Sequence, residues 1–433
     1  MKMDKPRVLV TTVGAWSDKS GSDTMSALMQ DYGAENVAAL YIRADKSDSR
    51  VASRYFQIME GRVMKSILHP SIQTGEEFRP EDVRISEVSE DESAEENRYS
   101  KFKRHRWGIF LFAREFVWKL GHWKSKELDA FLEDYNPEVL VCPIESYIHF
   151  NTINEYIIKK CHPKVIGFLW DDNFTYKQHP YSLIFKIERF FLRKQVRRLI
   201  NSCTDVLAIS PKMKEECDKE FGVDSIVITK PIFNCGEFED YQAGTPVRIL
   251  YTGKLIIGRD DTVIEVVKAI KEINKDGQKA ILDIYTNTQL SEDKKAKIAV
   301  EGCCNLHGPV PQSEVAALQK NADVLLFAES LSDRDLTARL SFSTKLTDYF
   351  AAGKCIWAVG NSDLGPIEYL RKEDAGLISA SLTGITEKLN LLINNSAIIS
   401  EYAEKAYRCG ENKHNKDMIT NKLYCILTST GGG

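Results

Sequence analysis

The chain alternates short apolar runs with segments of helical length, and it does so in both halves. In the first half, the apolar runs include Val8–Val13, Val139–Pro143 and Val165–Trp170. In the second half, they include Arg248–Thr252 and Ala280–Tyr285. Short runs of this kind predict strands buried on both faces, and parallel strands need a long crossover between them, which the helical segments supply. The sequence therefore predicts an α/β fold with two doubly wound parallel sheets.

A polar stretch with turn-forming residues separates the two halves. Residues 234–246 contain two glycines and end in Pro246. We therefore predict a first domain over 1–233, a linker over 234–246 and a second domain over 247–412. A chain of 433 residues, 43% of them hydrophobic, is long enough to bury two cores.

Composition narrows the class of protein only modestly. A formal net charge of −4 argues against a dedicated nucleic-acid binder. The 10 cysteines are scattered without the paired spacing of zinc sites, so we expect reduced thiols, no metal site and a cytoplasmic location. No apolar run reaches transmembrane length, and Met1–Arg7 leads into a strand rather than resembling a signal sequence.

Two further segments carry structural expectations. The stretch Thr74–Asn97 is strongly acidic and has little apolar periodicity, which predicts a mobile loop. Gly365–Leu370 and Ala375–Ile378 are expected to complete the second sheet.

The segment 341–360 predicts a capped helix that leads into a buried strand. Ser343 or Thr344 can cap this helix, which leaves backbone N–H groups and the positive end of the helix dipole at its start. Such a helix start is a natural seat for a phosphate group. We therefore expect the first turn, from Ser343 to Leu346, to contact a ligand.

Two charged residues strengthen this expectation. Lys345 adds a cation at the helix start, and Asp348 lies about one turn further on roughly the same side. A carboxylate there could accept both hydroxyls of a ribose. The arrangement suits a nucleoside diphosphate, although an ordinary helix–strand unit with an Asp on the helix face is the simpler alternative.

The strand over 248–252 ends in a glycine and a cation. Gly253 and Lys254 follow it directly, and Arg259 comes five positions after Lys254, just before a predicted helix. Two cations beside a glycine turn can hold a diphosphate. We therefore predict that this turn and the helix start at Ser343 bind the same ligand.

Two carboxylates follow a strand of the first half. Asp171 and Asp172 come directly after Val165–Trp170. In open parallel sheets, ligands bind at the carboxyl ends of the strands. We predict that both acids contact the hydroxyl groups of an acceptor; a divalent metal site or a hydrogen-bonded strand end are the alternatives.

The loop after the first strand is rich in glycine and serine. It spans Gly14–Ser22 and lacks the three spaced glycines of the dinucleotide-binding pattern, which weakens a nicotinamide-dehydrogenase interpretation. Gly21 at the start of the next helix is a candidate ligand contact; a plain turn between strand and helix is the alternative.

Two stretches of the first domain combine cations with aromatic residues. They are Lys101–Trp123 and Tyr181–Ile200. Such stretches can dock on a membrane surface or contact a lipid-linked acceptor. The alternative is that both helices pack their aromatic faces in the core and leave only charges in solvent.

The segment around Asp348 resembles the carboxyl-half motif of the retaining glycosyltransferases of family four, which have the GT-B fold. That motif is Glu, seven residues, Glu, a hydrophobic pair and Ala-Gly. Asp348 stands at the second Glu and Leu340 at the first. A variant with Ser-Lys-Leu-x-(Glu or Asp)-Tyr-x-Ala-Ala-Gly, found in sugar transferases of bacterial surface polysaccharides, is closely similar to Thr344–Gly353, with Thr344 at the position of the Ser.

Other positions resemble the same enzymes. Lys254 and Arg259 stand at the two basic positions of the pattern Gly-Arg-Leu followed by Lys-Gly. Gly21 resembles the GT-B glycine loop near the sugar phosphate. The resemblance further implies that the turn containing His307, Gly308 and Val310 lies beside the nucleobase, and that a last helix over about 413–430 packs back on the first domain.

The resemblance implies two Rossmann-like domains that face each other across a cleft, and transfer of a sugar from a nucleotide diphosphate-sugar to a glycan hydroxyl. It implies retention at the sugar carbon and no metal ion or other cofactor. The partners would be the nucleotide-sugar and a glycan acceptor that could be lipid-linked. A nucleotide-sugar epimerase and a non-catalytic protein that has lost the first Glu are the alternatives.

Overall fold

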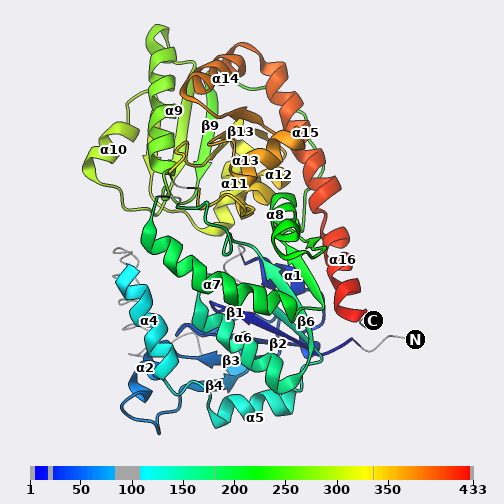
Figure 1. Cartoon of the computed structure of the whole chain (residues 1–433). Helices are drawn as coiled ribbons and strands as arrows, with labels where there is room; N and C mark the ends of the chain where they lie inside the picture. The colour runs from blue at the N-terminus through cyan, green and yellow to red at the C-terminus, as the bar shows by residue number, and fades with distance from the viewer. Residues whose placement is uncertain (1–4, 18–22, 83–107, 180, 335, 430–433) are drawn as a thin grey trace.

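The computed structural model describes residues 5–17, 23–82, 108–179, 181–334 and 336–429 and contains two separate sheets (Figure 1). The first sheet has eight strands in the order β4-β3-β2-β1-β5-β6-β7-β8, and only the edge pair of β3 and β4 is antiparallel. Its strands are β1 (Val8–Thr12), β2 (Val37–Tyr41), β3 (Arg54–Ile58), β4 (Gly75–Phe78), β5 (Val139–Pro143), β6 (Lys164–Leu169), β7 (Asp205–Ala208) and β8 (Ile226–Val227).

The second sheet has six strands, all parallel, in the order β11-β10-β9-β12-β13-β14. Its strands are β9 (Val247–Thr252), β10 (Ala280–Tyr285), β11 (Cys304–His307), β12 (Val324–Ala328), β13 (Cys355–Val359) and β14 (Leu377–Ser379).

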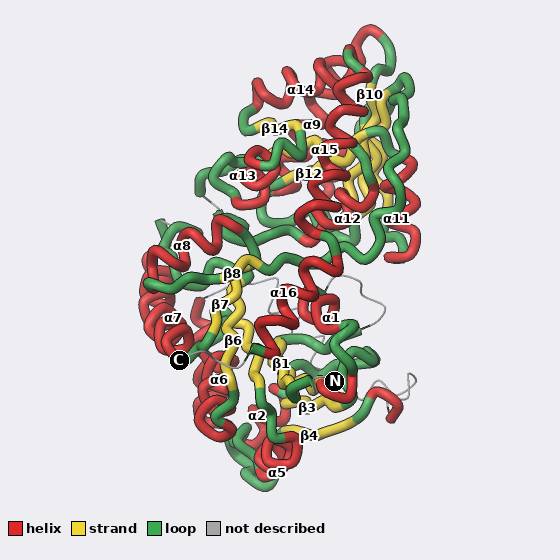
Figure 2. The backbone as a smooth tube through the Cα atoms, turned by 90° about the vertical axis from the view of Figure 1, so that its right-hand side faces the viewer, coloured by secondary structure: helices red, strands yellow, loops and turns green. Residues whose placement is uncertain are grey.

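Helices cover both faces of each sheet (Figure 1). The first sheet is covered by α4, α5, α6, α7 and α8 on one face and by α1 on the other (Figure 2). These helices, with α2, are α1 (Thr24–Met29), α2 (Glu60–Ser66), α4 (Gly108–Leu120), α5 (Lys126–Tyr135), α6 (Ile148–Cys161), α7 (Leu183–Asn201) and α8 (Pro211–Phe221). The later helices are α9 (Arg259–Ile273), α10 (Glu292–Ile298), α11 (Gln312–Asn321), α12 (Thr344–Ala352), α13 (Gly365–Lys372), α14 (Leu382–Asn394), α15 (Ser396–His414) and α16 (Lys416–Thr428).

This architecture confirms the predicted α/β class with two doubly wound parallel sheets. The apolar runs determine it locally, because strands such as β1 and β12 are buried along their whole length and need a helix layer on each face. One apolar cluster is continuous between the domains: it joins Ile232 to Phe342 and Phe350. The two sheets therefore share part of a single core.

The end of the chain returns to the first domain. Helix α15 packs on α12 and β13 of the second domain. Helix α16 lies beside α1 (Figure 2). The Lys164 ammonium donates to the Ile426 carbonyl at 2.6 Å, and the backbone N–H of Ile232 donates to the His414 carbonyl at 2.9 Å.

Two local predictions were wrong. Gly75–Phe78 forms the edge strand β4, whose acids pair with cations: Glu77 with Arg54 and Glu76 with Arg62. The remaining part of the expected loop, from residue 83, lies outside the described residues. Gly365–Lys372 is helix α13 rather than a strand, because Pro366 in its first turn favours a helix start and its apolar residues bury one helical face.

Candidate active site

The second sheet has a topological switch point between β9 and β12. These strands are neighbours, and the chain continues from β9 toward β10 and from β12 toward β13, in opposite directions. The helices that follow them therefore lie on opposite faces and leave a crevice at the carboxyl ends of the two strands. Gly253 follows β9 and Glu329 follows β12 at this crevice.

Gly253 and Lys345 are in close contact there. Gly253 has φ +128°, and a Cβ atom at this position would lie 2.5 Å from Lys345 Cε. The Lys345 ammonium donates to the Tyr251 hydroxyl at 3.0 Å and lies 4.3 Å from the centre of its ring. The backbone conformation favours glycine at this position, and its missing side chain leaves the space that the end of Lys345 occupies.

The surroundings of Lys345 change its protonation. Burial, followed by repulsion from Arg259, lowers the pKa of its ammonium to about 7, while Glu329 and Asp348 act in the opposite direction. A lysine in this state gains its full charge when an anion approaches.

Arg259 is the first residue of α9 and forms a two-point ion pair with Glu329. Its Nε and one terminal nitrogen donate to the two carboxylate oxygens at 2.9 and 2.7 Å. The Glu329 side chain is almost fully buried. Arg259 thus lies at the start of α9 beside the crevice, and two of its donor nitrogens are already engaged. Glu329 was not predicted; the only hint was an acid that ends the apolar run of β12.

The turn between β9 and α9 is unusual. Lys254 is exposed, and the described residues offer its ammonium no ion pair or hydrogen bond. Ile257 adopts φ +58°, which is rare for a β-branched residue, and Gly258 follows with φ +74°. A turn held in such a conformation is typical of ligand-binding loops.

Helix α12 begins at Thr344, as predicted. Ser343 is its N-cap residue with extended backbone angles, but its side chain makes no capping hydrogen bond. The Leu346 side chain is fully buried, and its N–H donates to the Ser343 carbonyl at 3.0 Å. The core and the helix thus already engage the side chain and the N–H of Leu346, and a ligand contact from this residue stays a prediction.

Asp348 faces the boundary between the domains. Its carboxylate lies 3.6 Å from the Lys230 ammonium, and burial raises the pKa of this carboxyl while Lys230 lowers it. Asp348 lines a cleft of about 580 Å³. The other wall of the cleft comes from the first domain and includes Ser26 and Val51. Asp348 is thus accessible to a ligand held between the domains.

The three residues predicted to lie beside a base are at the carboxyl end of β11. His307 stacks on Tyr285 with ring centres 4.4 Å apart, and it contacts the Asp283 carboxylate at 2.9 Å. Gly308 has open space around it, and Val310 is half-buried. The stacked rings form a flat surface next to β9.

The two adjacent carboxylates after β6 have different surroundings. Asp172 is fully buried; it accepts hydrogen bonds from the N–H and the hydroxyl of Thr175, and it lies 3.7 Å from Arg339. These contacts give Asp172 a structural function. Asp171 accepts a hydrogen bond from the Ser341 hydroxyl at 2.8 Å and keeps contact with solvent. The Asp171 carboxyl is solvent-accessible, but protein atoms pack closely around it. This burial raises its pKa, and repulsion from Asp172 raises it further.

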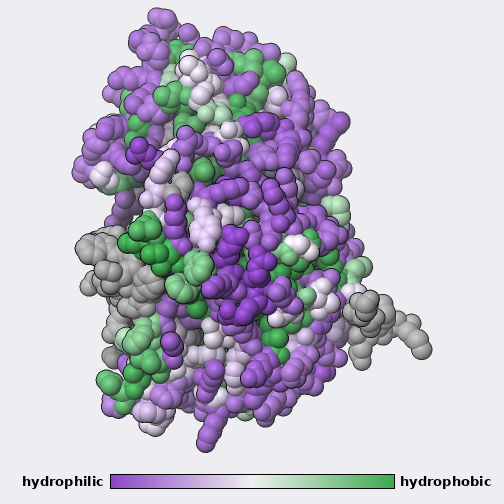
Figure 3. Space-filling model, in the orientation of Figure 1, coloured by the Kyte–Doolittle hydropathy of each residue, from purple (hydrophilic) through white to green (hydrophobic). Residues whose placement is uncertain are grey.

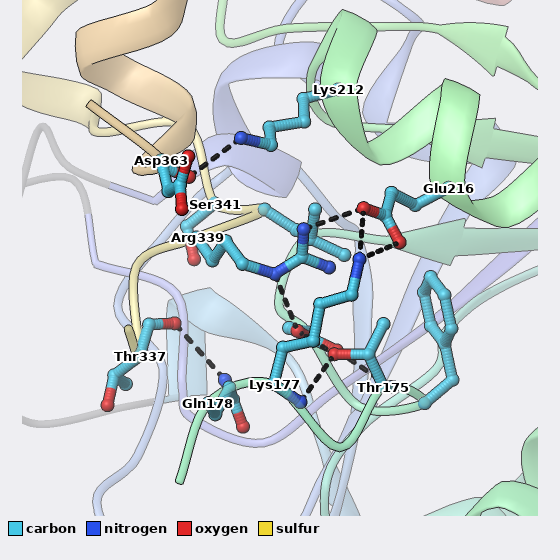
Figure 4. Close-up of polar contacts among 12 residues, drawn as sticks. Thr175, Lys177, Gln178, Lys212, Glu216, Thr337, Arg339, Ser341 and Asp363 are labelled. Carbon is cyan, nitrogen blue, oxygen red and sulfur yellow. Dashed lines mark hydrogen bonds and ion pairs between the residues drawn. The ribbon is translucent and has the colours of Figure 1, made fainter. Parts of the chain in front are cut away.

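Polar contacts bind the loop before α12 to the first domain (Figure 4). The Arg339 guanidinium pairs with Glu216 at 2.6 Å. Burial raises the pKa of the Glu216 carboxyl, but hydrogen bonds from Arg339 and Lys177 outweigh burial and lower this pKa to about 2. Gln178 donates to the Thr337 carbonyl at 3.1 Å. No sequence pattern indicated the contacts of Arg339 with Glu216 and of Gln178 with Thr337, since each joins residues more than a hundred positions apart.

Three further predictions concern Gly21, metal ions and membrane-spanning helices. Gly21 lies outside the described residues. In the described ranges, no group of three or more His, Cys, Asp or Glu side chains is arranged to hold a metal ion. None of the helices in these ranges is both long and apolar enough to cross a membrane.

The comparison with known proteins rests on structure, since no protein-family model and no curated protein matches the sequence. HepE of Anabaena, solved with UDP, superposes with a TM-score of 0.62 at 8% identity over 98% of this chain and 100% of its own. Sucrose-phosphate synthase from Thermosynechococcus elongatus gives 0.61 at 12% identity over 97% of both chains. TarM gives 0.53 at 14% identity over 69% of this chain, which spans 57% of TarM. Two doubly wound domains that superpose on these proteins show that the chain has the GT-B fold.

Proposed function

We propose that this chain transfers a sugar from a nucleotide diphosphate-sugar to a hydroxyl group of a glycan acceptor, with retention, in the assembly of a bacterial surface polysaccharide or glycoconjugate. The observation that carries the proposal is the set of cations at the switch point of the second sheet. Lys345 and Arg259 line the crevice, and Lys254 extends from its turn. The start of α12 adds backbone N–H groups to the same place.

These groups suit a departing nucleotide diphosphate. As the bond to the sugar breaks, negative charge grows on the phosphate, and fixed cations stabilise it most at that stage. In the retaining reaction, the departing phosphate takes the proton of the acceptor hydroxyl on the same face of the sugar. Because the cations of the chain supply the compensating charge, the proposal includes no metal ion or other cofactor.

The remaining parts of the donor have candidate positions on either side of the cations. The stacked rings of His307 and Tyr285 offer a flat surface for a base. Asp348 offers carboxylate oxygens for ribose hydroxyls, provided that it shares them with Lys230. We assign the first domain, including Asp171, to the acceptor.

The ligands of the structural neighbours support this assignment. HepE was solved with UDP and glucose, and TarM of S. aureus with UDP and α-GlcNAc-glycerol. The neighbours named as synthases make sugar phosphates and give no specific support to an epimerase or to a non-catalytic protein.

A screen of nucleotide sugars tests the proposal. A ligand that binds only the folded state raises the melting temperature by linkage. We expect at least one nucleotide sugar to raise it, and the same compound to be hydrolysed slowly or transferred to a glycan by the purified protein. Stabilisation without turnover would favour a non-catalytic protein, and release of an epimer would favour an epimerase.

The state of Lys345 predicts a pH dependence of donor binding. The pKa of its ammonium is about 7 in the free protein, so the cation is increasingly lost above this pH. Donor affinity should therefore fall by up to tenfold per pH unit between about pH 7 and 9. Calorimetry with the nucleotide sugar selected by the screen, in two buffers of different ionisation heat, should also detect proton uptake on binding.

Lys345→Met is the matched control for this measurement. It keeps the length of the side chain but cannot take up a proton, so it should bind the donor weakly and equally across the pH range. A pH profile shared by the wild type and Lys345→Met would contradict the assignment of the titration to Lys345.

The surface of α7 supports a location at the cytoplasmic face of a membrane. The helix exposes Leu183, Ile187, Phe190 and Phe191, and Figure 3 shows apolar atoms gathered over it. A solvent-exposed apolar row of this kind on a helix is uncommon. The first domain therefore does not bury all the aromatic residues of this stretch.

The cations near this row differ in their availability. Arg193 and Arg197 pair with Glu220, and Arg198 pairs with Glu155. Lys186 and Lys194 are exposed beside the apolar residues. The other predicted cations, which are Lys101, Lys103, Arg104 and Arg106, lie outside the described residues.

Vesicle co-sedimentation tests the membrane proposal. Each exposed cation contributes about 1 kcal/mol near an anionic bilayer, and apolar insertion adds a part that resists salt. We expect binding to vesicles of phosphatidylglycerol and phosphatidylcholine that weakens with salt. Phe190→Ser with Phe191→Ser should abolish the salt-resistant part. Absence of binding at low salt would refute membrane attachment and favour a soluble acceptor.

A further inference from the structure

Glu145 lies at the switch point of the first sheet. The chain continues from β1 toward β2 and from β5 toward β6, so the crevice between domains opens at the carboxyl ends of β1 and β5. Glu145 is the second residue after β5, and Gly14 is the second after β1. In the second sheet, Gly253 and Glu329 come directly after the corresponding strands, β9 and β12.

Glu145 is a buried acid that forms no ion pair with any of the described residues. In the described part of the chain, the other buried carboxylates each lie within 4 Å of an arginine: Asp172 at 3.7 Å from Arg339, Asp323 at 3.8 Å from Arg248 and Glu329 at 2.7 Å from Arg259. The same ranges contain no such ion pair for Glu145, although its side chain is only 9% exposed. An uncompensated buried acid costs stability, and such groups are concentrated at functional sites.

Hydrogen bonds hold Glu145 in place. Its N–H donates to the Asn151 side chain at 3.0 Å, and its carbonyl accepts from the same side chain at 2.8 Å. The indole N–H of Trp170 donates to one oxygen of its carboxyl group at 3.0 Å. The loop is therefore pre-organised.

The charged groups that face Glu145 are Asp171, from the end of β6, and Arg43, which follows β2. Burial, and then repulsion from Asp171, raise the pKa of the Glu145 carboxyl to about 8, while Arg43 opposes the shift. At neutral pH, Glu145 is therefore a hydrogen-bond donor. Its neighbour Asp171, which keeps contact with solvent, supplies acceptor oxygens.

We propose that Glu145 is a specificity-determining residue that binds the carbohydrate acceptor, an inference that rests on the transfer reaction proposed above. Glu145 donates a hydrogen bond to an acceptor hydroxyl, and Asp171 accepts a hydrogen bond from the same or the adjacent hydroxyl. One donor and one acceptor from neighbouring strands match the two hydrogen-bonding functions of a sugar hydroxyl group. Asp171 also contacts Ser341, so this position lies at the second domain.

The first test measures acceptor binding in two variants. Protein saturated with UDP is titrated with the methyl glycosides of glucose, galactose and N-acetylglucosamine. We expect at least one glycoside to bind the wild type, and Glu145→Ala to weaken its affinity at least tenfold. Glu145→Gln keeps a neutral donor of similar shape and should stay within threefold at pH 7. Affinity of the wild type should fall above pH 8, whereas that of Glu145→Gln should not.

The outcomes separate this proposal from the proposed function. Failure of UDP and every nucleotide sugar to bind would refute the transfer reaction. Intact UDP binding with equal glycoside affinity in Glu145→Ala and wild type, or with no glycoside bound by the wild type, would refute the role of Glu145. Glu133 on α5 has a largely exposed side chain, and Glu133→Gln is the matched control. This variant should change the affinity neither for UDP nor for the glycosides.

A second measurement needs no ligand. Because the pKa of Glu145 in the folded protein lies above its ordinary value, its contribution to stability is complete at acidic pH and is lost as the pH rises through about 8. Glu145→Gln removes this loss. The melting temperature of Glu145→Gln relative to wild type should therefore increase from pH 6 to pH 9, and a constant difference would show that the carboxyl does not titrate as proposed.

Discussion

Lys254→Ala should lower the rate of sugar transfer by roughly 30- to 1,000-fold, which corresponds to about 2–4 kcal/mol of lost transition-state stabilisation. The expected loss is large because an ammonium on a departing phosphate acts where negative charge develops. The folded protein should be unaffected, since the Lys254 side chain is exposed and has no ion pair or hydrogen bond among the described residues. Initial rates with the donor from the screen, together with the melting temperature, check both expectations.

Lys271→Ala is the control for this substitution. Lys271 is an exposed lysine on α9 of the same domain, and it lies in the last turn of the helix, whereas the crevice is at the start. Its removal changes the net charge of the protein equally and should leave the rate unchanged. Near-normal transfer by Lys254→Ala would contradict the assignment of the diphosphate to this turn.

Arg259→Ala should impair both turnover and stability. The substitution leaves the Glu329 carboxylate buried without its partner, and breaking a buried ion pair in this way costs about 3–5 kcal/mol. Urea denaturation should show this loss of stability. The rate of sugar transfer should also fall, because the variant loses the donor nitrogens of Arg259 that remain available to the phosphate. The expected effect on stability distinguishes Arg259 from Lys254, although the resemblance places both at basic positions of one motif.

A double substitution separates the two effects. Arg259→Met with Glu329→Leu replaces the pair by apolar side chains of similar volume, which is often neutral or stabilising for buried pairs. The double variant should regain most of the stability that Arg259→Ala loses, while transfer stays low. Recovery of activity along with stability would show that Arg259 serves only the fold.

The sequence determined the local features of the donor side. The apolar runs predicted most strands of both sheets, because a strand buried on two faces must be apolar along its length; β3 and the edge strand β4 were not predicted. The order of glycine, cation and helix after β9 placed Gly253, Lys254 and Arg259 at one end of the second sheet. The start of α12 at Thr344 was predicted from Ser343 and Thr344 as local helix-start residues, although the Ser343 side chain makes no capping hydrogen bond. Chemistry that depends on neighbours in the chain could be predicted.

Only the tertiary structure decided which of these groups remain available to a ligand. Glu329 engages Arg259 across 70 positions, and Arg339 holds Asp172 from the opposite domain. Glu145 stands in a loop with no motif, and its significance comes from its burial at a switch point without an ion pair among the described residues. Partners of this kind are brought together by the packing of whole layers. The energy of a buried charge depends on these distant neighbours, so no local pattern of residues records it.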